Sequence, residues 1–289
     1  MTEKISPARF EKYLARRESE AHKGSFGRAL LICGSFGMAG AAVLSARAAL
    51  RSGVGLCECL LPPDIYPIVS AAVPEAVFTP DDSLRTVLKR VQAAGAVLIG
   101  CGLGAGRQAA EAVQMVCETC ERPLVIDADG INAICGHIDV LEKHQSDVIL
   151  TPHPGEMARL IGTSAAQIQS RREETAREFA ARTGTILVLK GHETVVALPG
   201  GETFVNPTGN PGMATGGSGD VLAGILVSLL AQGLPAAEAA MAAVYIHGLA
   251  GDRSAARLSQ HAMLPSDIIE RLPEVFLEFE KQRGVELEK

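Results

Sequence analysis

The segment with the clearest potential for chemistry is a glycine-rich loop at residues 206–219, which ends at Asp220 and precedes the apolar run VLAGILVSLL. Gly216, Gly217 and Gly219 let the backbone approach a ligand closely. Amides at the start of the following helix, with the helix dipole, would bind an anion such as a phosphate. A carboxylate in that turn suits a base that takes a proton from a hydroxyl attacking a phosphoryl group. Alternatively, Asp220 only caps the helix, since Gly, Ser and Asp are all common at such ends.

A second glycine-rich turn, GCGLGA, lies at residues 100–105 between an apolar run and a helical stretch. It fits the pattern G-x-G-x-x-A, and Asp127 ends the next expected strand roughly 20 residues on, which is typical of a dinucleotide-binding fingerprint. A tight strand-to-helix turn without a ligand is the alternative, because the chain holds 30 glycines and the motif lies in mid-chain.

Two more polar segments follow expected strands. In TPHPGE, residues 151–156, a proline on each side of His153 fixes the backbone and removes amide donors. That rigidity suits a ligand contact, although a lone histidine is often structural. In KGHET, residues 190–194, Lys190 could pair with a phosphate and Gly191 could let a base or ribose approach. A β-turn with a solvated lysine is the alternative there.

Other familiar catalytic motifs fit poorly. Cys117 and Cys120 form a C-x-x-C at a helix end with no second pair nearby, so neither a four-ligand zinc site nor thioredoxin-like chemistry is expected. His192 and Glu193 do not continue to H-E-x-x-H. The absence of G-x-S-x-G and of G-x-x-x-x-G-K-[ST] argues against an α/β-hydrolase and a P-loop enzyme.

The segments that must position these residues alternate between short apolar runs and helical stretches. Strands are expected at residues 28–33, 54–60, 96–99, 124–126, 148–150 and 186–189, with a hairpin at 195–198 and 202–205. Helices are expected from the GSFGMAG turn to about residue 52 and at residues 107–120, 165–182, 221–231 and 235–255. This order predicts an α/β fold with a mostly parallel central sheet and helices on both faces. Such sheets bind ligands at the carboxyl ends of their strands, where the distinctive loops fall.

Composition narrows the class of protein. The chain has 289 residues, of which 47% are hydrophobic and 21% charged, as in an ordinary globular protein. A net charge of -6 does not suit a nucleic-acid binder. No apolar run reaches the ~18–20 residues of a membrane span, and the charged N-terminal stretch does not read as a secretory signal. Seven cysteines suggest reduced thiols in a cytoplasm. We expect an N-terminal helical extension at residues 1–21 and a single domain at residues 22–280.

The segment GMATGGSGDVLAG, residues 212–224, resembles the ribokinase-like superfamily, whose members place a glycine-rich anion hole before a base aspartate. Further motifs narrow the likeness: HKGSFG at 22–27, GS at 34–35 with GAA at 40–42, RSG at 51–53, GLG at 102–104, DAD at 127–129 with Asn132, TPHPGE and KGHET. Together they look like the ADP-dependent NAD(P)H-hydrate dehydratase family over about residues 22–270. Ser218 stands where many relatives carry Thr, and both residues offer a hydroxyl.

The resemblance implies a ribokinase-like fold and the repair of hydrated NADH and NADPH. Such an enzyme phosphorylates the hydroxyl of the S form of the hydrate, and elimination of phosphate restores the nicotinamide ring. ADP, or ATP, would supply the phosphoryl group, with Mg²⁺ bridging the nucleotide phosphates. No metal ligand of the chain is directly assigned.

The resemblance also implies roles for individual residues. Those expected to contact the hydrated dinucleotide are Ala41, Gly104, His153 and Asp220. Those expected to hold the adenine nucleotide are Lys190, Gly191, His192, Glu193, Thr194 and Gly219. Asp220 would be the base, and the amides of residues 216–219, those of Gly217 and Gly219 among them, would stabilise charge on the transferred phosphoryl group.

Partners and alternatives follow from the same likeness. Relatives tend to form homotetramers, and some carry an N-terminal epimerase domain, so here we expect the NAD(P)H-hydrate epimerase to be a separate chain. One alternative is a ribokinase-like kinase of a small alcohol, such as a thiazole or pyrimidine precursor. Another is a nucleotide-binding regulator without catalysis. A third is a nicotinamide-dependent dehydrogenase, which rests on residues 100–105 alone.

Overall fold

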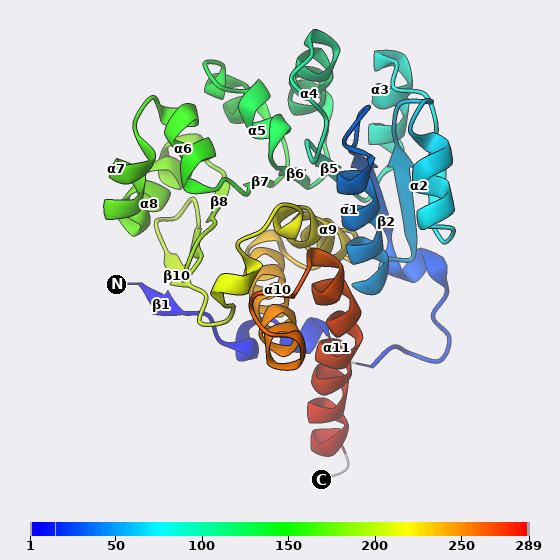
Figure 1. Ribbon diagram of the computed structural model, residues 1–289, viewed down its shortest axis with the longest axis vertical. Coiled ribbons are helices and arrows are strands. Elements are labelled where there is room, and N and C mark those ends of the chain that lie inside the picture. The colour runs from blue at the N-terminus through cyan, green and yellow to red at the C-terminus, as the bar shows by residue number, and fades with distance from the viewer. Residues whose placement is uncertain (1, 15, 288–289) are drawn as a thin grey trace.

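A ten-stranded sheet forms the centre of the computed structural model, which describes residues 2–14 and 16–287 (Figure 1). The strands lie in the order β1-β10-β9-β8-β7-β6-β5-β2-β3-β4. Their bounds are β1 Glu3–Lys4, β2 Arg28–Ile32, β3 Leu56–Leu60, β4 Val77–Thr79, β5 Ala96–Ile99, β6 Leu124–Ile126, β7 Val148–Leu150, β8 Ile186–Leu189, β9 Val195–Ala197 and β10 Thr203–Val205. Pairing is parallel from β4 to β8, while β9 runs antiparallel to both β8 and β10. The predicted mostly parallel sheet is thus confirmed.

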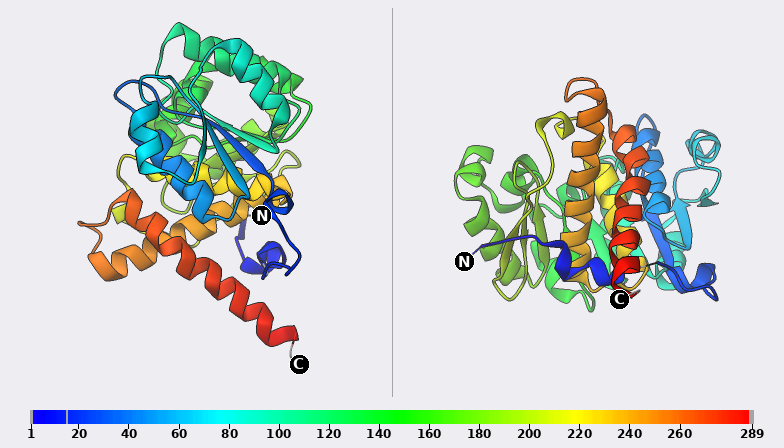
Figure 2. Two further views of the ribbon diagram at one scale, coloured as in Figure 1. Left: turned by 90° about the vertical axis from the view of Figure 1, so that its right-hand side faces the viewer. Right: turned by 90° about the horizontal axis from the view of Figure 1, so that it is seen from below.

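Helices cover both faces of this sheet, as Figures 1 and 2 show. On one face lie α1 (Ala39–Arg51), α2 (Tyr66–Ala72), α9 (Ser218–Ala231), α10 (Ala236–Leu258) and α11 (Pro265–Leu287). On the other lie α3 (Leu84–Ala93), α4 (Arg107–Thr119), α5 (Asp129–Ala133), α6 (Pro154–Ile161), α7 (Ala165–Ser170) and α8 (Arg172–Thr183). No helix in the described part of the chain is long and apolar enough to span a membrane.

The central strands are apolar on both sides because each face supports a separate core. In β5, Leu98 packs into the cluster beneath α1 and α9, whereas Val97 and Ile99 pack into the cluster beneath α3 and α4. Successive side chains of a strand point to opposite faces. All four residues of β5 are buried, which accounts for the continuous apolar run that predicted a strand there.

Close contact between α1 and α9 fixes the start of α9 near the carboxyl edge of the sheet. A Cβ on Gly224 of α9 would lie 2.3 Å from the carbonyl oxygen of Ser45 in α1, so only glycine fits. The apolar sequence of α9 follows from this position, since the helix is buried along nearly its whole length. The glycine-rich loop before α9 is therefore anchored on a rigid, buried element.

Several elements differ from expectation. The helix expected at residues 165–182 is two helices, α7 and α8, because the backbone at Arg171 leaves the helical region with φ -138°. Strand β4 and helices α2, α3, α5, α6 and α11 were not expected. Strand β4 and helices α2 and α5 are short, whereas Leu84, Val87, Leu88 and Val91 of α3 do have the apolar spacing of a helix.

The described part of residues 1–21 is not the expected α-helix. Its first element is β1, which adds a parallel strand beside β10, and two short 3-10 helices follow at Pro7–Arg9 and Glu11–Tyr13. The segment is held by the hydrogen bonds of these short elements and by burial. Phe10 is fully buried, with its ring 5.7 Å from that of Tyr245 and 6.0 Å from that of Phe279.

Candidate active site

Asp127 is the buried centre of a polar cluster at the carboxyl edge of the sheet. Its Oδ1 accepts a hydrogen bond from Lys190 Nζ at 2.7 Å and another from Thr151 Oγ1 at 2.7 Å. The thiol of Cys101 lies 3.6 Å from Oδ2. The four residues follow β6, β8, β7 and β5 respectively. Neighbouring parallel strands therefore deliver one cation and three polar groups to a single point, as the parallel sheet predicts.

Asp220 completes this cluster from the first turn of α9. Oxygens of Asp127 and Asp220 and the sulfur of Cys101 all lie within 4.8 Å of one another. Burial, followed by the charge of Asp127, raises the pKa of Asp220 from 3.8 to about 6, although a Cys101 hydrogen bond and the charge of Lys190 act in the opposite direction. A carboxyl group with such a pKa is ionised at neutral pH and still basic enough to accept a proton.

The alternative role of Asp220 as a helix cap is not supported. Gly217 is the N-cap of α9, with φ +98°, and it makes no side-chain capping hydrogen bond. Within the described residues, the structure records no hydrogen bond from a backbone amide of α9 to Asp220, and none from the amides of Gly219 and Asp220 to any group. The first turn of α9 therefore presents amides without a recorded partner beside the Asp220 carboxylate, which Cys101 hydrogen-bonds. Free helix N-terminal amides bind anions.

Gly219 allows the helix start to approach Lys190. A Cβ at this position would lie 3.1 Å from Lys190 Nζ and 3.6 Å from Asp127 Oδ2. Lys190 is not the solvated lysine of a surface turn, because its side chain is only 18% exposed. Burial lowers its pKa, but the charges of Asp127 and of Glu156, whose Oε2 is 3.9 Å away, raise it above the ordinary value. Lys190 is thus a charged ammonium group at the first turn of α9.

His153 has a structural role that the flanking prolines did not reveal. Its Nδ1 accepts hydrogen bonds from the amides of Gly155 at 2.9 Å and Glu156 at 3.2 Å, and Glu156 Oε2 accepts one from the His153 amide at 2.8 Å. This reciprocal pair is a capping box for α6. Half of the side chain remains exposed, with Nε2 3.4 Å from Glu156 Oε1. The imidazole is therefore fixed by the helix and presents its other nitrogen at the surface.

Ala41 lies in the first turn of α1 and Gly104 in the loop after β5, and Gly102 of that loop contacts Ala41. The Gly104 amide donates to Asp129 Oδ2 at 2.8 Å, and a Cβ on Gly102 would lie 2.7 Å from that of Ala41. The fingerprint at residues 100–105 serves packing as well, since a Cβ on Gly100, with φ +125°, would lie 1.9 Å from the Asp127 carbonyl oxygen. Asp127 itself is occupied by Lys190 and Thr151, so it does not act as the ribose acceptor of a dehydrogenase.

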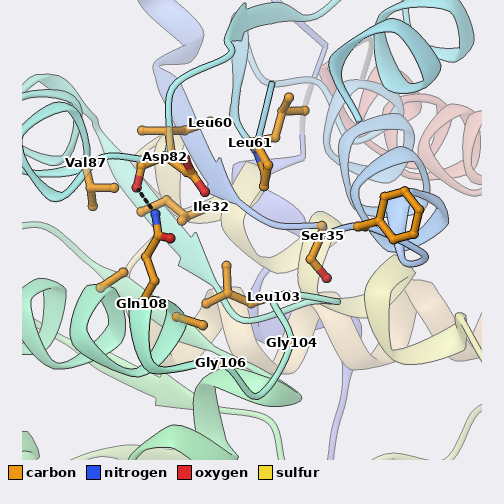
Figure 3. Close-up of a pocket in the computed structure, with 15 residues that line it drawn as sticks. Ile32, Ser35, Leu60, Leu61, Asp82, Val87, Leu103, Gly104, Gly106 and Gln108 are labelled. Carbon is orange, nitrogen blue, oxygen red and sulfur yellow. Dashed lines mark hydrogen bonds between the residues drawn. The ribbon is translucent and has the colours of Figure 1, made fainter. Parts of the chain in front are cut away.

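A cavity of about 320 Å³ opens beside Ser35 and Gly104 (Figure 3). Its walls are mainly apolar, and the polar groups are those of Ser35, Asp82 and Gln108, whose Nε2 donates to the Asp82 carbonyl at 3.2 Å. Other wall residues are Ile32, Leu60, Leu61, Val87, Leu103 and Ala112. This volume lies at the lower end of the ~300–1,000 Å³ typical of ligand pockets. The cavity holds no basic side chain.

Some residues of the cluster were not predicted as site residues. Thr151, Glu156 and Asp127 lie in motifs that were noted, and their places after strands are the signal that could have found them. His247 has no such signal, because it lies in the middle of α10. Burial and then the charge of Lys190 lower its pKa to about 4, so it is neutral, and its Nε2 is 3.4 Å from Ser218 Oγ.

The cluster fits a magnesium ion only as part of a nucleotide complex. Mg²⁺ prefers six oxygen ligands and usually binds through one or two carboxylates, waters and substrate phosphates. Asp127 and Asp220 are the carboxylates in reach of each other, but Asp127 Oδ1 already accepts from Lys190 and Thr151. The described residues therefore offer two carboxylates for such an ion and no complete cage.

Comparison with known proteins agrees with this geometry. Residues 29–274 match the family model described as NAD(P)H-hydrate dehydratase. The chain is 44% identical over 248 residues to an ADP-dependent (S)-NAD(P)H-hydrate dehydratase of Neisseria meningitidis, covering 84% of this chain and 82% of that protein. It is 41% identical over 279 residues to a bifunctional NAD(P)H-hydrate repair enzyme of Moorella thermoacetica, covering 93% of this chain but only 53% of the relative.

A solved structure is similar over nearly the whole chain. It is the ADP/ATP-dependent NAD(P)H-hydrate dehydratase of Bacillus subtilis co-crystallised with ATP and Mg²⁺, with a TM-score of 0.84, 32% identity and coverage of 96% of this chain and 99% of that one. The chain thus spans about half the length of the bifunctional relative and nearly all of a single-activity one. The family expected from the motifs is confirmed: this chain belongs to the NAD(P)H-hydrate dehydratase family.

Proposed function

We propose that this chain dehydrates the S form of hydrated NADH and NADPH, using an adenine nucleotide as phosphoryl donor. The observation that carries this proposal is Asp220, a carboxyl group with a pKa of about 6 beside the free amides that begin α9. The Neisseria meningitidis relative, which is named for this activity and is 44% identical, supports the choice of substrate. The ATP co-crystallised with the Bacillus subtilis enzyme supports the choice of donor.

In the first step, Asp220 takes the proton of the hydrate hydroxyl as its oxygen attacks the terminal phosphoryl group of ADP or ATP. The bond between that phosphorus and the nucleotide oxygen breaks, and the amides of Gly217 and Gly219 stabilise the negative charge. In the second step, the carbon–oxygen bond breaks, phosphate leaves, and loss of a proton from the adjacent ring carbon restores the double bond. A Mg²⁺ ion bound with the nucleotide would neutralise phosphate charge, and Asp127 and Asp220 are the carboxylates that could hold it.

The two substrates approach from opposite sides of Asp220. Lys190, Gly191, His192, Glu193 and Thr194 follow β8 and hold the nucleotide, with Gly219 closing the site. Ala41, Gly104 and His153 hold the nicotinamide end of the hydrate. The rest of the dinucleotide extends from Gly104 and Ser35 into the adjoining cavity, whose apolar walls suit a base.

Partners and location are part of the same proposal. A base and a phosphoryl site fixed in one geometry reach a hydroxyl on only one face of the ring, so the other epimer needs an epimerase. The relative named as a bifunctional NAD(P)H-hydrate repair enzyme supports the presence of a second repair activity beside this one. We infer that a separate epimerase serves this chain, that the chain assembles as a homotetramer, and that it works in the cytoplasm.

The test is to incubate the protein with the separated epimers of hydrated NADH and with ADP and Mg²⁺. Recovery of the reduced nicotinamide absorbance from the S epimer, with one AMP and one phosphate released per NADH, is the expected result. Omission of ADP is the control. Consumption of both epimers at equal enzymatic rates would contradict the proposal. Phosphorylation of thiazole or pyrimidine alcohols without action on the hydrate would favour the small-alcohol kinase.

A further inference from the structure

The loop at residues 190–194 has an unusual backbone that needs support. Gly191 has φ +149°, and Glu193 has φ +54°, which is in the left-handed region although Glu193 is not a glycine. Such a conformation persists only where the surroundings hold it. Within the loop, the Thr194 hydroxyl donates to the Gly191 carbonyl at 3.0 Å. This single contact does not reach His192 or Glu193, so the main support must come from outside the loop.

The support comes from Arg172, the first residue of α8. Its Nη1 donates to the His192 carbonyl, and its Nη2 donates to the carbonyls of Leu189 at 3.0 Å and Glu193 at 3.4 Å. One guanidinium group thus binds the residue that precedes the loop and two residues within it. A Cβ on Gly191 would lie 3.0 Å from Nη2 and 3.2 Å from Cζ, so glycine is needed here to admit the guanidinium group.

The electrostatic setting of Arg172 is unfavourable unless these contacts compensate. Burial lowers its pKa, and its Nε is buried without a hydrogen-bond partner in the described part of the chain. A cation in the first turn also opposes the positive end of the helix dipole. A guanidinium group placed in this way is explained by the three carbonyls that it binds, because its planar fork can bind them together.

Arg172 also determines which loop groups remain available to a ligand. In a planar peptide unit, the N–H points opposite to the C=O. Because the His192 and Glu193 carbonyls face Arg172, the following amides, those of Glu193 and Thr194, point away from it. The structure records no hydrogen bond from either amide within residues 2–14 and 16–287. Successive free amides around a left-handed residue form a concave site for anionic or polar ligand atoms.

We propose that Arg172 is a positioning residue of the nucleotide site, which holds the 190–194 loop in the shape that binds ADP without touching the nucleotide. This inference rests on the proposed function only in naming ADP as the occupant of the loop. Lysine cannot replace it fully, because a single ammonium group does not offer the planar fork of donors that the three carbonyls need.

The adjacent Arg171 provides a matched control. It precedes α8 as its N-cap, but it is 62% exposed and pairs with Glu174 at 2.6 Å. Substitution of either arginine by methionine removes the same charge from the same turn. Only the Arg172 change removes support from the loop.

The experiment measures ADP binding by calorimetry and steady-state kinetics for Arg172→Met, Arg172→Lys and Arg171→Met. For Arg172→Met, we expect the Kd and KM of ADP to rise on the order of tenfold to a hundredfold, the range for loss of charge-assisted hydrogen bonds. The KM of the hydrate and kcat at saturating ADP should change less than about twofold, as expected for loss of uniform binding. The Kd of ADP for Arg172→Lys should lie between the values for Arg172→Met and the unmodified protein. Arg171→Met should bind ADP as the unmodified protein does.

Unchanged ADP affinity in Arg172→Met, with or without a lower melting temperature, would overturn the proposal and leave Arg172 a structural residue. An equal rise in the KM of hydrate and ADP would also overturn it. If Arg172→Met does not fold, the comparison of Arg172→Lys with Arg171→Met decides. Weaker ADP binding by Arg172→Lys than by Arg171→Met supports the proposal, and equal ADP binding overturns it. Failure of the unmodified protein to act on the hydrate would refute the proposed function, but the ADP calorimetry would still test Arg172.

Discussion

Asp220 is subject to two opposing requirements. Burial favours its neutral form, whereas a general base must be ionised before it can take a proton. With a pKa of about 6, about 90% of the group is ionised at pH 7. Lys190 and the Cys101 thiol keep the pKa from rising further. The Cys101 thiol stays protonated, since its hydrogen bond with Cys33 and its burial raise its pKa well above the ordinary value.

Substitution of Asp220 by asparagine therefore separates catalysis from binding. Asp220→Asn keeps the size of the side chain but cannot accept a proton, so we expect NADH formation to slow by roughly 10²–10⁴, the usual contribution of a general base. ADP affinity should stay within a few-fold, because the amides of α9 and Lys190 remain. In the unmodified protein, the rate should fall as the pH drops through about 6. A near-normal rate in Asp220→Asn would contradict the assignment of the base.

The stability of Asp220→Asn provides an independent check on the same carboxylate. The folded-state pKa of about 6 lies above the ordinary 3.8, so the unfolded chain loses this proton first as the pH rises. As the pH rises from about 4 to about 6, the free energy of unfolding of the unmodified protein therefore falls by roughly 2–3 kcal/mol for a shift of this size. Asp220→Asn should be the more stable protein at pH 8 and lose that advantage near pH 4, as measured by urea unfolding at both values.

Substitution of Lys190 should change both the stability of the protein and its affinity for ADP. Lys190→Met leaves the buried Asp127 carboxylate without its cation, so we expect a loss of about 3–5 kcal/mol in the free energy of unfolding. ADP binding should weaken on the order of tenfold or more. The double variant Lys190→Met with Asp127→Asn should regain most of the stability, because no charge is then left unpaired, but it should not regain ADP affinity. Recovered affinity would remove Lys190 from the nucleotide site.

At this scale, the sequence predicts which loops meet but not the bonds between their side chains. Lys190 was recognisable because it follows an expected strand, and Asp220 because it follows a glycine-rich loop at the start of a helix. The salt bridge from Lys190 to Asp127 joins residues 63 positions apart, and nothing in either local segment reports the partner. The cap formed by His153 was hidden for another reason: the sequence shows the prolines that restrict it, but not which nitrogen accepts the α6 amides.

At the scale of elements, the loops that follow the strands differ in the groups and the space that they present. The loop after β8 is drawn toward α8 by Arg172 and presents amides. The loops after β2 and β5 border a cavity between α3 and α4. Under the proposed function, this arrangement would keep the nucleotide and the hydrate apart until their reacting groups meet at Asp220.

The cavity can be tested by filling it from α4. Ala109 lines the cavity, whereas its neighbour Ala110 is exposed and does not. Ala109→Phe should raise the KM of the hydrate on the order of tenfold, because the base of the dinucleotide loses its space, and should leave the Kd of ADP unchanged. Ala110→Phe should behave like the unmodified protein. Equal hydrate affinity in both variants would place the far end of the substrate elsewhere.

The elements that the sequence predicted well are those buried on both faces. The runs at residues 96–99 and 186–189 became β5 and β8 with the expected bounds, since complete burial requires an uninterrupted apolar run. Helices α2 and α3 bury only one or two residues each. Helix α2 has seven residues and one buried side chain, whereas the apolar residues of α3 have helical spacing, so that helix could have been predicted. The break between α7 and α8 lies at Arg171, whose φ of -138° the local sequence did not predict.

At the scale of the whole molecule, the N-terminal segment is joined to β10 and, on the sheet face opposite α3 and α4, to helices α10 and α11. The N-terminal segment pairs β1 with β10 and then packs Phe10 between α10 and α11 (Figure 2). Helix α10 also carries His247 beside Ser218 at the start of α9. The segment therefore supports a helix that reaches the active site, although its described residues contribute no side chain to the polar cluster of that site.

This arrangement predicts a large stability effect from a single ring far along the chain from the catalytic loop. Phe10 is fully buried, so Phe10→Ala should lower the free energy of unfolding by about 3–5 kcal/mol through lost burial and the cavity left behind. For a protein of this size, the melting temperature should fall on the order of 10 °C. Phe36→Ala is the matched control, because that ring is 85% exposed and its loss should leave the melting temperature nearly unchanged. If both variants melt with the unmodified protein, the N-terminal segment is not docked on α10 and α11 in solution; if only Phe10→Ala melts early while its kcat at 25 °C is retained, the segment acts as a structural support for the fold.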